Sequence, residues 1–496
     1  MTEINQKTAD NLQPRPPVVV ILGHVDHGKT TLLDYIRKTN LASREAGGIT
    51  QSVGAYEIEH NNLKLTFIDT PGHEAFTKMR SHGARIADLA ILVVSADDGV
   101  KPQTAESIKI LKESNIPFVV AINKIDKDNA DIERTKQDLL SHEVFLEKLG
   151  GNIGWQEISA KEGLGIDELL DLIVLTAEME ELKYDPQANA SGFILESKLN
   201  KQRGNEVLVV IKEGTLKEGQ EIIAGSAVGK IKILEDFKGQ RSKELSPSSP
   251  AIIIGFESLP EVGTQFTAGS VNLAEVKIDQ LEDKNNSLPV ITENKEGEIS
   301  LNLIIKSDTS GSLEALSQVI QSLPSADDQV KINIISQGVG EVSDGDIKEA
   351  LNTHSLIIGF GVKVNKSAEN LARARDIEIN TSKIIYELVK FVEEKISSLQ
   401  KEKDKISRLL VLAIFSTSNG KQTIGGRVEE GSIRQGDSFQ IKREEEIIGR
   451  GKITNLQCQK DDVKEVLEGK ECGLTTQLQS DVCIEKDDQI IITRSN

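Results

Sequence analysis

The sequence VVVILGHVDHGKTT (residues 18–31) decides the fold of the first part of the chain. Its apolar start predicts a buried strand, and TTLLDYIRK (30–38) predicts a helix directly after the glycines. The loop between them matches the pattern GxxxxGK[ST], which requires this strand–loop–helix context. Backbone N–H groups of such a loop wrap phosphate groups, and the N-terminus of the helix favours anions. The predicted phosphate-binding residues are Gly23, His24, Val25, Asp26, His27, Gly28, Lys29, Thr30 and Thr31.

Further buried strands alternate with helical stretches after this motif. The apolar runs are LTFID (65–69), LAILVVSA (89–96) and PFVVAINK (117–124), and helix-like segments separate them. Such alternation predicts a parallel sheet with helices on both faces. We therefore expect an α/β P-loop domain over residues 17–182.

The polar motif DTPGH (69–73) ends one of these strands, where it would meet the outer phosphates. Asp69 can hold Mg²⁺ through a water molecule, and the Thr30 hydroxyl can bind the ion directly. Gly72 can bring its N–H to the γ-phosphate, Lys29 takes up charge, and His73 orients an attacking water. A simpler interpretation makes Asp69 a helix cap and His73 a surface residue. This part of the predicted site comprises Asp69, Thr70, Pro71, Gly72 and His73.

The glycine-rich loop GGIT (47–50) lies between the first helix and the DTPGH strand. The Thr50 hydroxyl would coordinate Mg²⁺ only while a γ-phosphate is present, which would make this loop a switch. The alternative is a plain loop with a helix-capping threonine.

Two later motifs indicate which base is bound. NKID (123–126) follows a buried strand, and a carboxylate there accepts hydrogen bonds from guanine N1–H and the exocyclic amine, a donor pair that adenine lacks. SAK (159–161) can offer a backbone N–H to guanine O6. The motifs occur in the order of a GTP-binding, GTP-hydrolysing domain. The predicted base-binding residues are Asn123, Lys124, Ile125, Asp126, Ser159, Ala160 and Lys161.

The rest of the chain changes character several times. EGTLKEGQEI (213–222) and EGSIRQGDSF (430–439) are similar, and GKIKIL or GKITNL follows each, which predicts two related barrels. The predicted organisation is a disordered tail (1–16), the P-loop domain (17–182), a β-barrel (188–272), a linker (273–298), a small α/β/α domain (299–380), a long exposed connecting helix (381–405) and a C-terminal β-barrel (406–496).

Composition limits the function classes. The net charge of −19 makes a general nucleic-acid binder improbable, so any RNA contact must be local. The 3 cysteines form no CxxC pair, which argues against a zinc site or a disulfide framework. No apolar run approaches the about 18 residues that span a bilayer, and the polar start resembles no signal peptide. We expect a cytoplasmic, monomeric protein without membrane contact.

The motifs closely resemble those of the translational GTPases. GHVDHGKTT, DTPGH and NKID have the form found in that group, and other stretches are similar to bacterial translation initiation factor two. These stretches are GGITQSVGAYEI (47–58), SADDGVKPQT (95–104), ILESKLNKQRGNEV (194–207), KSDTSGSLEAL (306–316) and KDDVKEVLEGKECG (460–473). The resemblance covers residues 17–496 in the family's domain order.

The resemblance implies further roles. Val25 and Ile49 would form an apolar gate that keeps His73 away from the phosphates until the ribosome acts, and Asp26 would help to hold a monovalent cation. The partners would be both ribosomal subunits, formylmethionyl initiator tRNA and other initiation factors. The resemblance also implies that a pocket of the C-terminal barrel carries the formylmethionyl end of the tRNA, although by sequence alone its residues are ordinary barrel turns and core. Those residues are Gly425, Gly426, Arg427, Lys460, Glu471, Cys472 and Gly473.

This chain departs from the family pattern at several places. The family's long N-terminal region has almost no counterpart before residue 17. Ser52 stands where the family commonly has His, Gly426 replaces a common Cys, and QCQ (457–459) replaces a basic and aromatic run.

Two other functions fit parts of the sequence. An elongation-type GTPase carrying another aminoacyl-tRNA would share the motifs, but it would not contain the second α/β domain and the long helix. A ribosome-binding module stabilised by unhydrolysed GTP would not need His73 or the switch-like Thr50.

Overall fold

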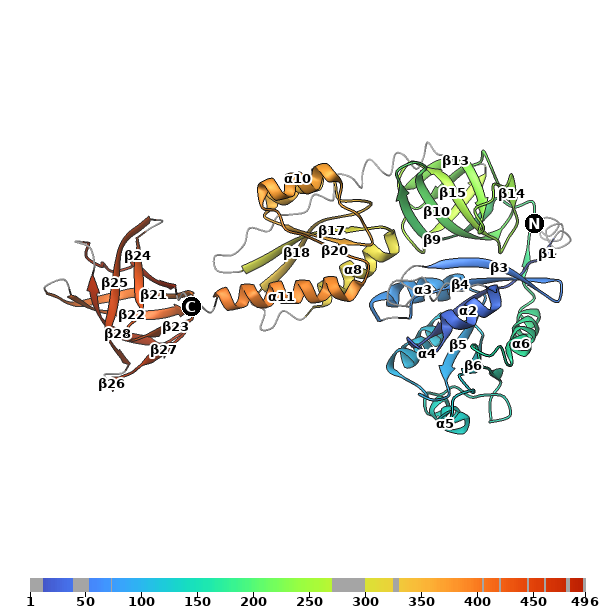
Figure 1. Cartoon of the computed structure of the whole chain (residues 1–496), viewed down its shortest axis with the longest axis horizontal. Helices are drawn as coiled ribbons and strands as arrows, with labels where there is room; N and C mark the ends of the chain where they lie inside the picture. Colours follow the sequence, from blue (N-terminus) through green and yellow to red (C-terminus); the bar gives the residue numbers. More distant parts are fainter. Residues whose placement is uncertain are drawn as a thin grey trace, which may run out of the picture. The chain divides into compact units, whose positions relative to one another are not determined.

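The computed structural model describes residues 12–38, 53–72, 74–269, 299–323, 330–403, 406–418, 421–443, 446–458, 461–478 and 482–493. The chain divides into two compact units. The first unit contains the N-terminal α/β domain, the first barrel and most of the second α/β domain, and the second contains the C-terminal barrel (Figure 1).

The N-terminal domain is built on a six-stranded sheet in the order β3-β4-β2-β5-β6-β7. Its strands are β2 (Val18–Gly23), β3 (Gly54–His60), β4 (Leu63–Asp69), β5 (Leu89–Ser95), β6 (Phe118–Asn123) and β7 (Trp155–Glu157). Its helices are α2 (Lys29–Arg37), α3 (Thr77–Ile86), α4 (Pro102–Ser114), α5 (Ile132–Ser141) and α6 (Ile166–Met179). β2, β5 and β6 read as continuous apolar runs because both of their faces are covered.

Alternate residues of β2 face different helices. Val19 and Ile21 belong to one buried cluster with Leu32 of α2 and Leu169 of α6. On the other face, a Cβ added at Gly83 of α3 would lie 3.2 Å from a methyl of Val20. The prediction of helices on both faces is therefore confirmed.

The four predicted strands are parallel, as expected, but the sheet also has an antiparallel edge strand that was not predicted. β3 pairs antiparallel with β4, whereas β2, β4, β5, β6 and β7 are joined by parallel pairings. The hairpin turns through Asn61 and Asn62, whose φ angles are 49° and 61°. Asparagine tolerates positive φ, so this dipeptide is the local signal that favours the tight turn.

The predicted disordered tail needs a similar correction at its end. Gln13–Pro14 form the short strand β1, which pairs antiparallel with β8 (Lys183–Tyr184). The Arg15 N–H also donates to the carbonyl of Leu182 at 3.1 Å. Residues 1–11 of that prediction lie outside the described residues.

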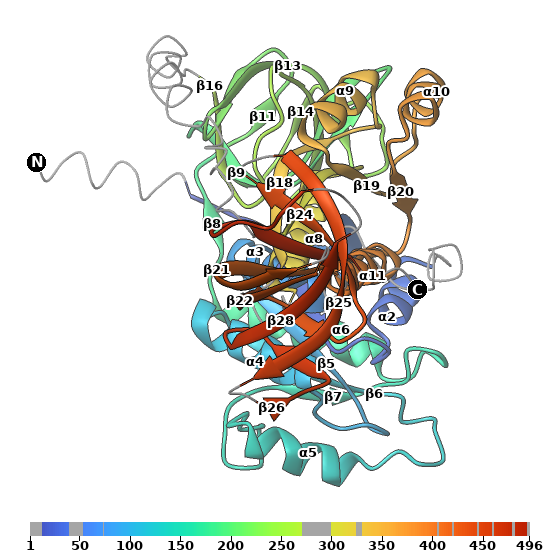
Figure 2. The same ribbon diagram turned by 90° about the vertical axis from the view of Figure 1, so that its left-hand side faces the viewer.

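The two barrels have the same topology, as the internal sequence repeat predicts. The first closes in the order β10-β15-β13-β12-β16-β9, and the second in the order β22-β28-β25-β24-β29-β21. The first consists of β9 (Ala190–Asn200), β10 (Gly204–Glu213), β12 (Glu221–Ala224), β13 (Ala227–Asp236), β15 (Pro250–Phe256) and β16 (Gln265–Gly269). The second consists of β21 (Ile406–Ser418), β22 (Lys421–Glu430), β24 (Ser438–Arg443), β25 (Glu446–Cys458), β28 (Glu471–Leu478) and β29 (Gln489–Thr493). Figure 2 looks onto the second barrel.

Each repeated sequence block occupies the same place in its barrel. EGTLKEGQEI contains β11 (Leu216–Lys217), which pairs with β14 (Glu244–Leu245) outside the ring. EGSIRQGDSF contains β23 (Ser432–Arg434), which pairs with β27 (Glu465–Leu467) in the same way. The short strand β26 (Asp461–Asp462) adds to β25 in the second barrel.

The second α/β domain has a sheet in the order β18-β17-β19-β20. Its strands are β17 (Ile299–Ser307), β18 (Val330–Val339), β19 (Leu356–Phe360) and β20 (Ile379–Ser382), and its helices are α8 (Ser310–Ser322), α9 (Asp344–Thr353) and α10 (Lys366–Arg375). α9 begins at a capping box between Ser343 and Asp346. The predicted linker (273–298) lies outside the described residues.

The predicted long helix is α11 (Ile385–Lys403). The expectation that it is exposed is only partly right, since Ile385, Leu388, Val392 and Ile396 are buried. These residues recur at helical spacing and form an apolar stripe, whereas the lysines and glutamates between them face outward. Among the described residues, no helix is long and apolar enough to cross a membrane.

Candidate functional site

The loop between β2 and α2 places a buried ammonium group at the predicted phosphate position. Lys29 Nζ donates to the carbonyl oxygens of Gly23 at 2.9 Å and His24 at 2.6 Å. Burial lowers the pKa of Lys29 to about 8, although the neighbouring carboxylate of Asp69 opposes this effect. A buried cation that donates to backbone carbonyls is well placed to gain from an anionic ligand.

Two glycines in this region have no space for a side chain. A Cβ at Gly72 would lie 2.3 Å from Lys29 Nζ, so the backbone of the DTPG turn approaches the ammonium group closely. Gly28 has φ 93°, and a Cβ there would lie 2.2 Å from Asn123 Nδ2. The sequence thus brings the phosphate loop, the DTPG turn and the NKID strand end together.

The predicted base-binding motifs are joined by side-chain hydrogen bonds. Asn123 Nδ2 donates to the carbonyl of His27 at 2.8 Å, and its Oδ1 accepts from the N–H of Ala160 at 2.9 Å. Ser159 Oγ donates to Asp126 Oδ1 at 2.6 Å, and this bond lowers the pKa of Asp126. Asp126 therefore stays ionised at neutral pH and presents an exposed acceptor beside Ala160.

The metal-binding predictions can be compared with the structure at two residues. Asp69 is buried at the end of β4, in register with Ile21 of β2, and Thr30 is half-buried in the first turn of α2. A hydroxyl and a carboxylate are hard oxygen donors that suit Mg²⁺. Ile49, Thr50, His73 and Lys460 lie outside the described residues.

The two histidines of the phosphate loop pack against each other. Their ring centroids are 5.0 Å apart at 70°, and His27 is completely buried. His27 Nδ1 accepts from the N–H of Ser95 at 3.3 Å. Burial and the neighbouring His24 lower the pKa of His27 to about 3, so this imidazole stays neutral and shapes the loop by packing.

Arg80 is a buried residue near the site that the motifs did not indicate. Its guanidinium donates to the carbonyl of Pro71 at 3.2 Å and forms two bonds of 2.7 and 2.8 Å with Glu106 of α4. Arg80 thereby ties the DTPG turn to the body of the domain. An arginine within an otherwise apolar helix face is the sequence signal that could have identified it.

A second unexpected group joins the N-terminal domain to the first barrel. Asp88 accepts two bonds from Arg15 at 2.6 and 2.7 Å and one from Lys212 of β10 at 2.6 Å. It also accepts from the N–H of Val18 at 2.9 Å. Burial works to raise the pKa of Asp88, but the two cations outweigh it and hold the pKa below its usual value.

A third unexpected group lies where the first barrel meets the second α/β domain. Glu196 of β9 is buried and accepts from the N–H of Gly311 at 3.0 Å, at the beginning of α8. A Cβ at Gly311 would lie 2.5 Å from the Met79 side chain of α3, so α3, β9 and α8 meet here. Burial raises the pKa of Glu196 to about 7.

Replacing Glu196 with glutamine should change the pH dependence of stability. A carboxyl group whose pKa rises from 4.5 to about 7 on folding stabilises the fold while protonated and loses this contribution as the pH rises through 7. At pH 8, Glu196→Gln should therefore be more stable than wild type by up to about 3 kcal/mol and should unfold at a higher temperature. Thermal unfolding of both proteins at pH 5.5 and pH 8 tests this. An identical pH dependence would contradict it.

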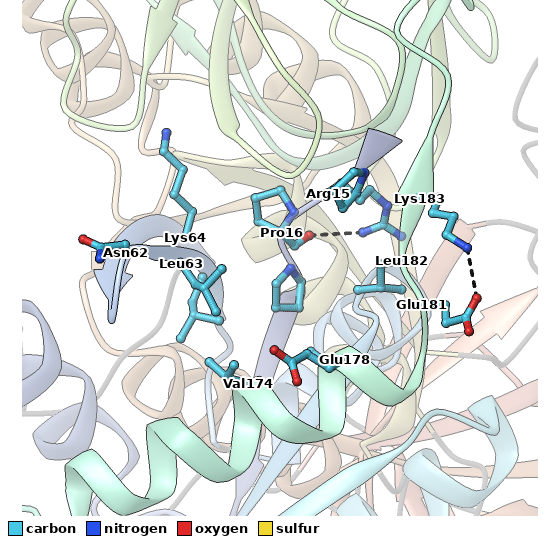
Figure 3. A pocket seen from close by; sticks show the side chains of 14 residues that line it. Arg15, Pro16, Asn62, Leu63, Lys64, Val174, Glu178, Glu181, Leu182 and Lys183 are labelled. Carbon is cyan, nitrogen blue, oxygen red and sulfur yellow. Dashed lines mark hydrogen bonds and ion pairs between the residues drawn. The ribbon is translucent and has the colours of Figure 1, made fainter. Parts of the chain in front are cut away.

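A cavity of about 610 Å³ lies away from the predicted nucleotide site, and Arg15 of the Asp88 group lines part of it. Arg15 and Pro16 precede β2, Leu63 and Lys64 belong to β4, and Val174 and Glu178 come from α6 (Figure 3). None of the predicted phosphate-binding or base-binding residues lines it.

The C-terminal barrel has a smaller cavity of about 370 Å³ at the predicted tRNA-end residues. Gly425 pairs with Gly473 and Gly426 with Cys472 across β22 and β28, so neighbouring strands lack side chains at the same level. A Cβ at Gly473 would meet no atom within 4 Å, which leaves the space open. The lining residues are Leu412, Ala413, Phe415, Gly425, Gly426, Gln457, Glu471, Cys472 and Gly473.

The cavity agrees with the prediction only in part. Arg427 does not line it, although it stands opposite Glu471 in the ladder. Leu412, Ala413 and Phe415 were not predicted. Phe415 is 69% exposed, and a large apolar side chain left in solvent beside a cavity is the feature that marks it.

Models of known protein families match separate parts of the chain, which correspond to the domains described above. The model of the elongation factor Tu GTP binding domain matches residues 15–179. The model of elongation factor G domain 2 matches residues 189–269, and that of translation-initiation factor 2 matches residues 276–393.

Similar proteins extend over nearly the whole chain. Translation initiation factor IF-2 of Halothermothrix orenii is 42% identical over 99% of this chain and 73% of its own length. The factor of Bartonella tribocorum is 42% identical over 94% of this chain, which spans only 57% of that relative. The crystal structure of GDP-bound aIF5B from Aeropyrum pernix covers 97% of this chain and 92% of that chain, with 26% identity and a TM-score of 0.46. From the relatives and the three models, the chain belongs to the translation initiation factor IF-2 family.

Proposed function

We propose that this chain is a translation initiation GTPase that binds GTP and formylmethionyl initiator tRNA on the ribosome. It promotes placement of the tRNA on the small subunit and joining of the large subunit, and hydrolysis of GTP then releases it. The observation that carries the proposal is the convergence of Lys29, Gly72 and the Asn123–Ala160 bond at one end of the sheet. An ammonium group, a bare backbone turn and a base-reading loop meet there.

The proposed chemistry is in-line attack of water on the γ-phosphate. Lys29 exchanges its bonds to the carbonyls of Gly23 and His24 for bonds to phosphate oxygens, and it takes up the charge that develops there. Thr30, Thr50 and, through water, Asp69 would hold Mg²⁺, which supplies further charge neutralisation when bound. His73 orients the water, and the apolar gate of Val25 and Ile49 delays this step until the ribosome acts.

Replacing His73 with alanine tests the hydrolytic role. His73→Ala should bind GTP normally but lose ribosome-stimulated hydrolysis, because the water is no longer oriented while the phosphate contacts persist. A loss of about 10²- to 10⁴-fold is expected for a positioned side chain that assists proton transfer. Measuring hydrolysis with and without ribosomes checks this, and equal stimulated rates would sink the proposal. Absence of stimulated hydrolysis in wild type itself would favour a non-hydrolysing module.

Asp126→Asn should shift base preference from guanine to xanthine. The amide can donate to the second exocyclic oxygen of xanthine, whereas the guanine amine loses its charged acceptor. Competition between GTP and XTP for the purified protein measures the shift. Unchanged selectivity for GTP would show that Asp126 does not read the base.

The remaining assignments complete the proposal. The cavity on β22 and β28 takes the formylmethionyl end of the tRNA, with its glycines admitting the group and Cys472 lining the space. Arg427 and Lys460 contact the same end of the tRNA. α11 connects the second α/β domain to this barrel, and Asp26 helps to hold a monovalent cation. The protein acts in the cytoplasm as a monomer, with other initiation factors as further partners.

A further inference from the structure

Two of the cysteines are neighbours at the edge of the C-terminal cavity. β25 and β28 run antiparallel with Gln457 opposite Gly473, so the next step of the ladder brings Cys458 opposite Cys472. Cys472 belongs to the buried core of the barrel, and Cys458 packs against that core. Both thiols therefore point to the same side of the sheet.

The spacing of such a pair suits a disulfide. Facing residues on antiparallel strands have Cα atoms about 4.5–5.5 Å apart, and disulfides bridge about 4.4–6.8 Å. Cys458 Sγ already donates to the carbonyl of Glu471 at 3.6 Å, on the strand that carries Cys472. The side chain of Cys458 thus reaches across to β28 without rearrangement of the backbone.

We propose that Cys458 and Cys472 form a reversible cross-strand disulfide that controls the C-terminal cavity. Glutathione disulfide is the oxidant. The Cys458 thiolate attacks one of its sulfurs, forming a mixed disulfide and releasing one glutathione thiolate. The Cys472 sulfur then attacks Cys458 Sγ, and the second glutathione leaves, so two protein thiols become one disulfide and two glutathione thiols form.

The environments of the two thiols determine this order. Cys458 is partly exposed, so it can meet the oxidant, whereas Cys472 is buried. Burial raises the pKa of Cys472 to about 12, which makes this thiol a poor first nucleophile and a slow resolving one. The third cysteine, Cys483, is exposed and does not belong to the barrel core cluster.

The bond has a consequence for the cavity, and this step rests on the proposed function. Cys472 lines the cavity, whereas Cys458 does not. A disulfide fixes Cys472 Sγ toward β25 and removes it from the surface that would meet the methionyl group. The oxidised protein is therefore the weaker binder of initiator tRNA, and reduction restores binding.

The experiment uses the full chain carrying Cys483→Ser, so that only the pair can be oxidised. After incubation with glutathione disulfide, trypsin should release ITNLQCQK (453–460) joined to the peptide that begins at Glu471, with the loss of two hydrogens. The matched control is Cys458→Ser, which should give no cross-linked peptide. If both thiols remain free, or form only mixed disulfides with glutathione, the proposed disulfide does not exist, whether or not the protein binds tRNA.

The second measurement is binding of formylmethionyl initiator tRNA by the same protein, oxidised and reduced. Oxidation should weaken binding at least several-fold, and Cys458→Ser should bind equally under both conditions. Equal affinities of the bridged and reduced forms would remove the regulatory role. Failure of both forms to bind would count against the proposed function, and the peptide map would still decide whether the bridge exists.

Discussion

Lys29→Met should abolish useful GTP binding without weakening the nucleotide-free fold. The ammonium group would make two charge-assisted hydrogen bonds to phosphate oxygens, each worth about 1.5–3 kcal/mol. Their loss corresponds to a decrease in affinity of roughly 10²- to 10⁴-fold. Titration with a fluorescent guanine nucleotide measures this decrease, and an affinity within threefold of wild type would contradict the assigned role.

The stability of the same variant provides an independent test. The pKa of Lys29 falls from 10.5 to about 8 on folding, so the buried charge disfavours the folded state by about 3 kcal/mol at neutral pH. Nucleotide-free wild type should therefore become more stable as the pH rises from 8 toward 10.5. Lys29→Met should lose that dependence and melt no lower than wild type at pH 7. Lower stability would show that the bonds to Gly23 and His24 hold the loop together.

Asp88→Asn should be the most destabilising single change at the junction of the N-terminal domain and the first barrel. The substitution keeps the shape but leaves Arg15 and Lys212 buried without a counter-charge. Breaking a buried ion pair from one side costs about 3–5 kcal/mol. Thermal and denaturant unfolding of the full chain should show this loss.

Two controls separate the buried pairing from a general effect of charge. Glu143→Gln removes the exposed partner of Lys112 and should leave the unfolding midpoint unchanged. Lys212→Met added to Asp88→Asn should recover part of the lost stability, because one unpaired cation is then gone. If the double variant is as unstable as Asp88→Asn alone, Lys212 is not part of the stabilising group.

The sequence predicts that the phosphate-loop, DTPG and NKID segments come together, because these motifs are local. Asp69 and Asn123 end strands, and Gly28 and Lys29 begin the helix that follows another; parallel strands bring such ends to one edge of the sheet. Local motifs do not reveal the glycines of the C-terminal cavity, which were predicted only from the family resemblance. Paired glycines on β22 and β28 become a cavity only when their register is known.

Contacts between distant segments could not be predicted in the same way. Asp88, Arg15 and Lys212 are far apart in the sequence, and each looks like an ordinary surface charge. Glu196 likewise gives no local sign that it will be buried against the beginning of α8. The position of Cys458 opposite Cys472 depends on the pairing of β25 with β28, which hydrophobic periodicity alone does not define.

The pairing of β1 with β8 means that the polypeptide enters and leaves the N-terminal domain at one spot. A domain with adjoining ends can be transplanted into another protein, or circularly permuted, with few broken contacts. New termini at the exposed Asn61-Asn62 turn, with residues 12 and 184 joined by a short bridge, would preserve every parallel pairing of the sheet. The covalent connections of this domain at its two ends therefore lie side by side, while its contacts with the first barrel, such as Asp88 with Lys212, are made through side chains.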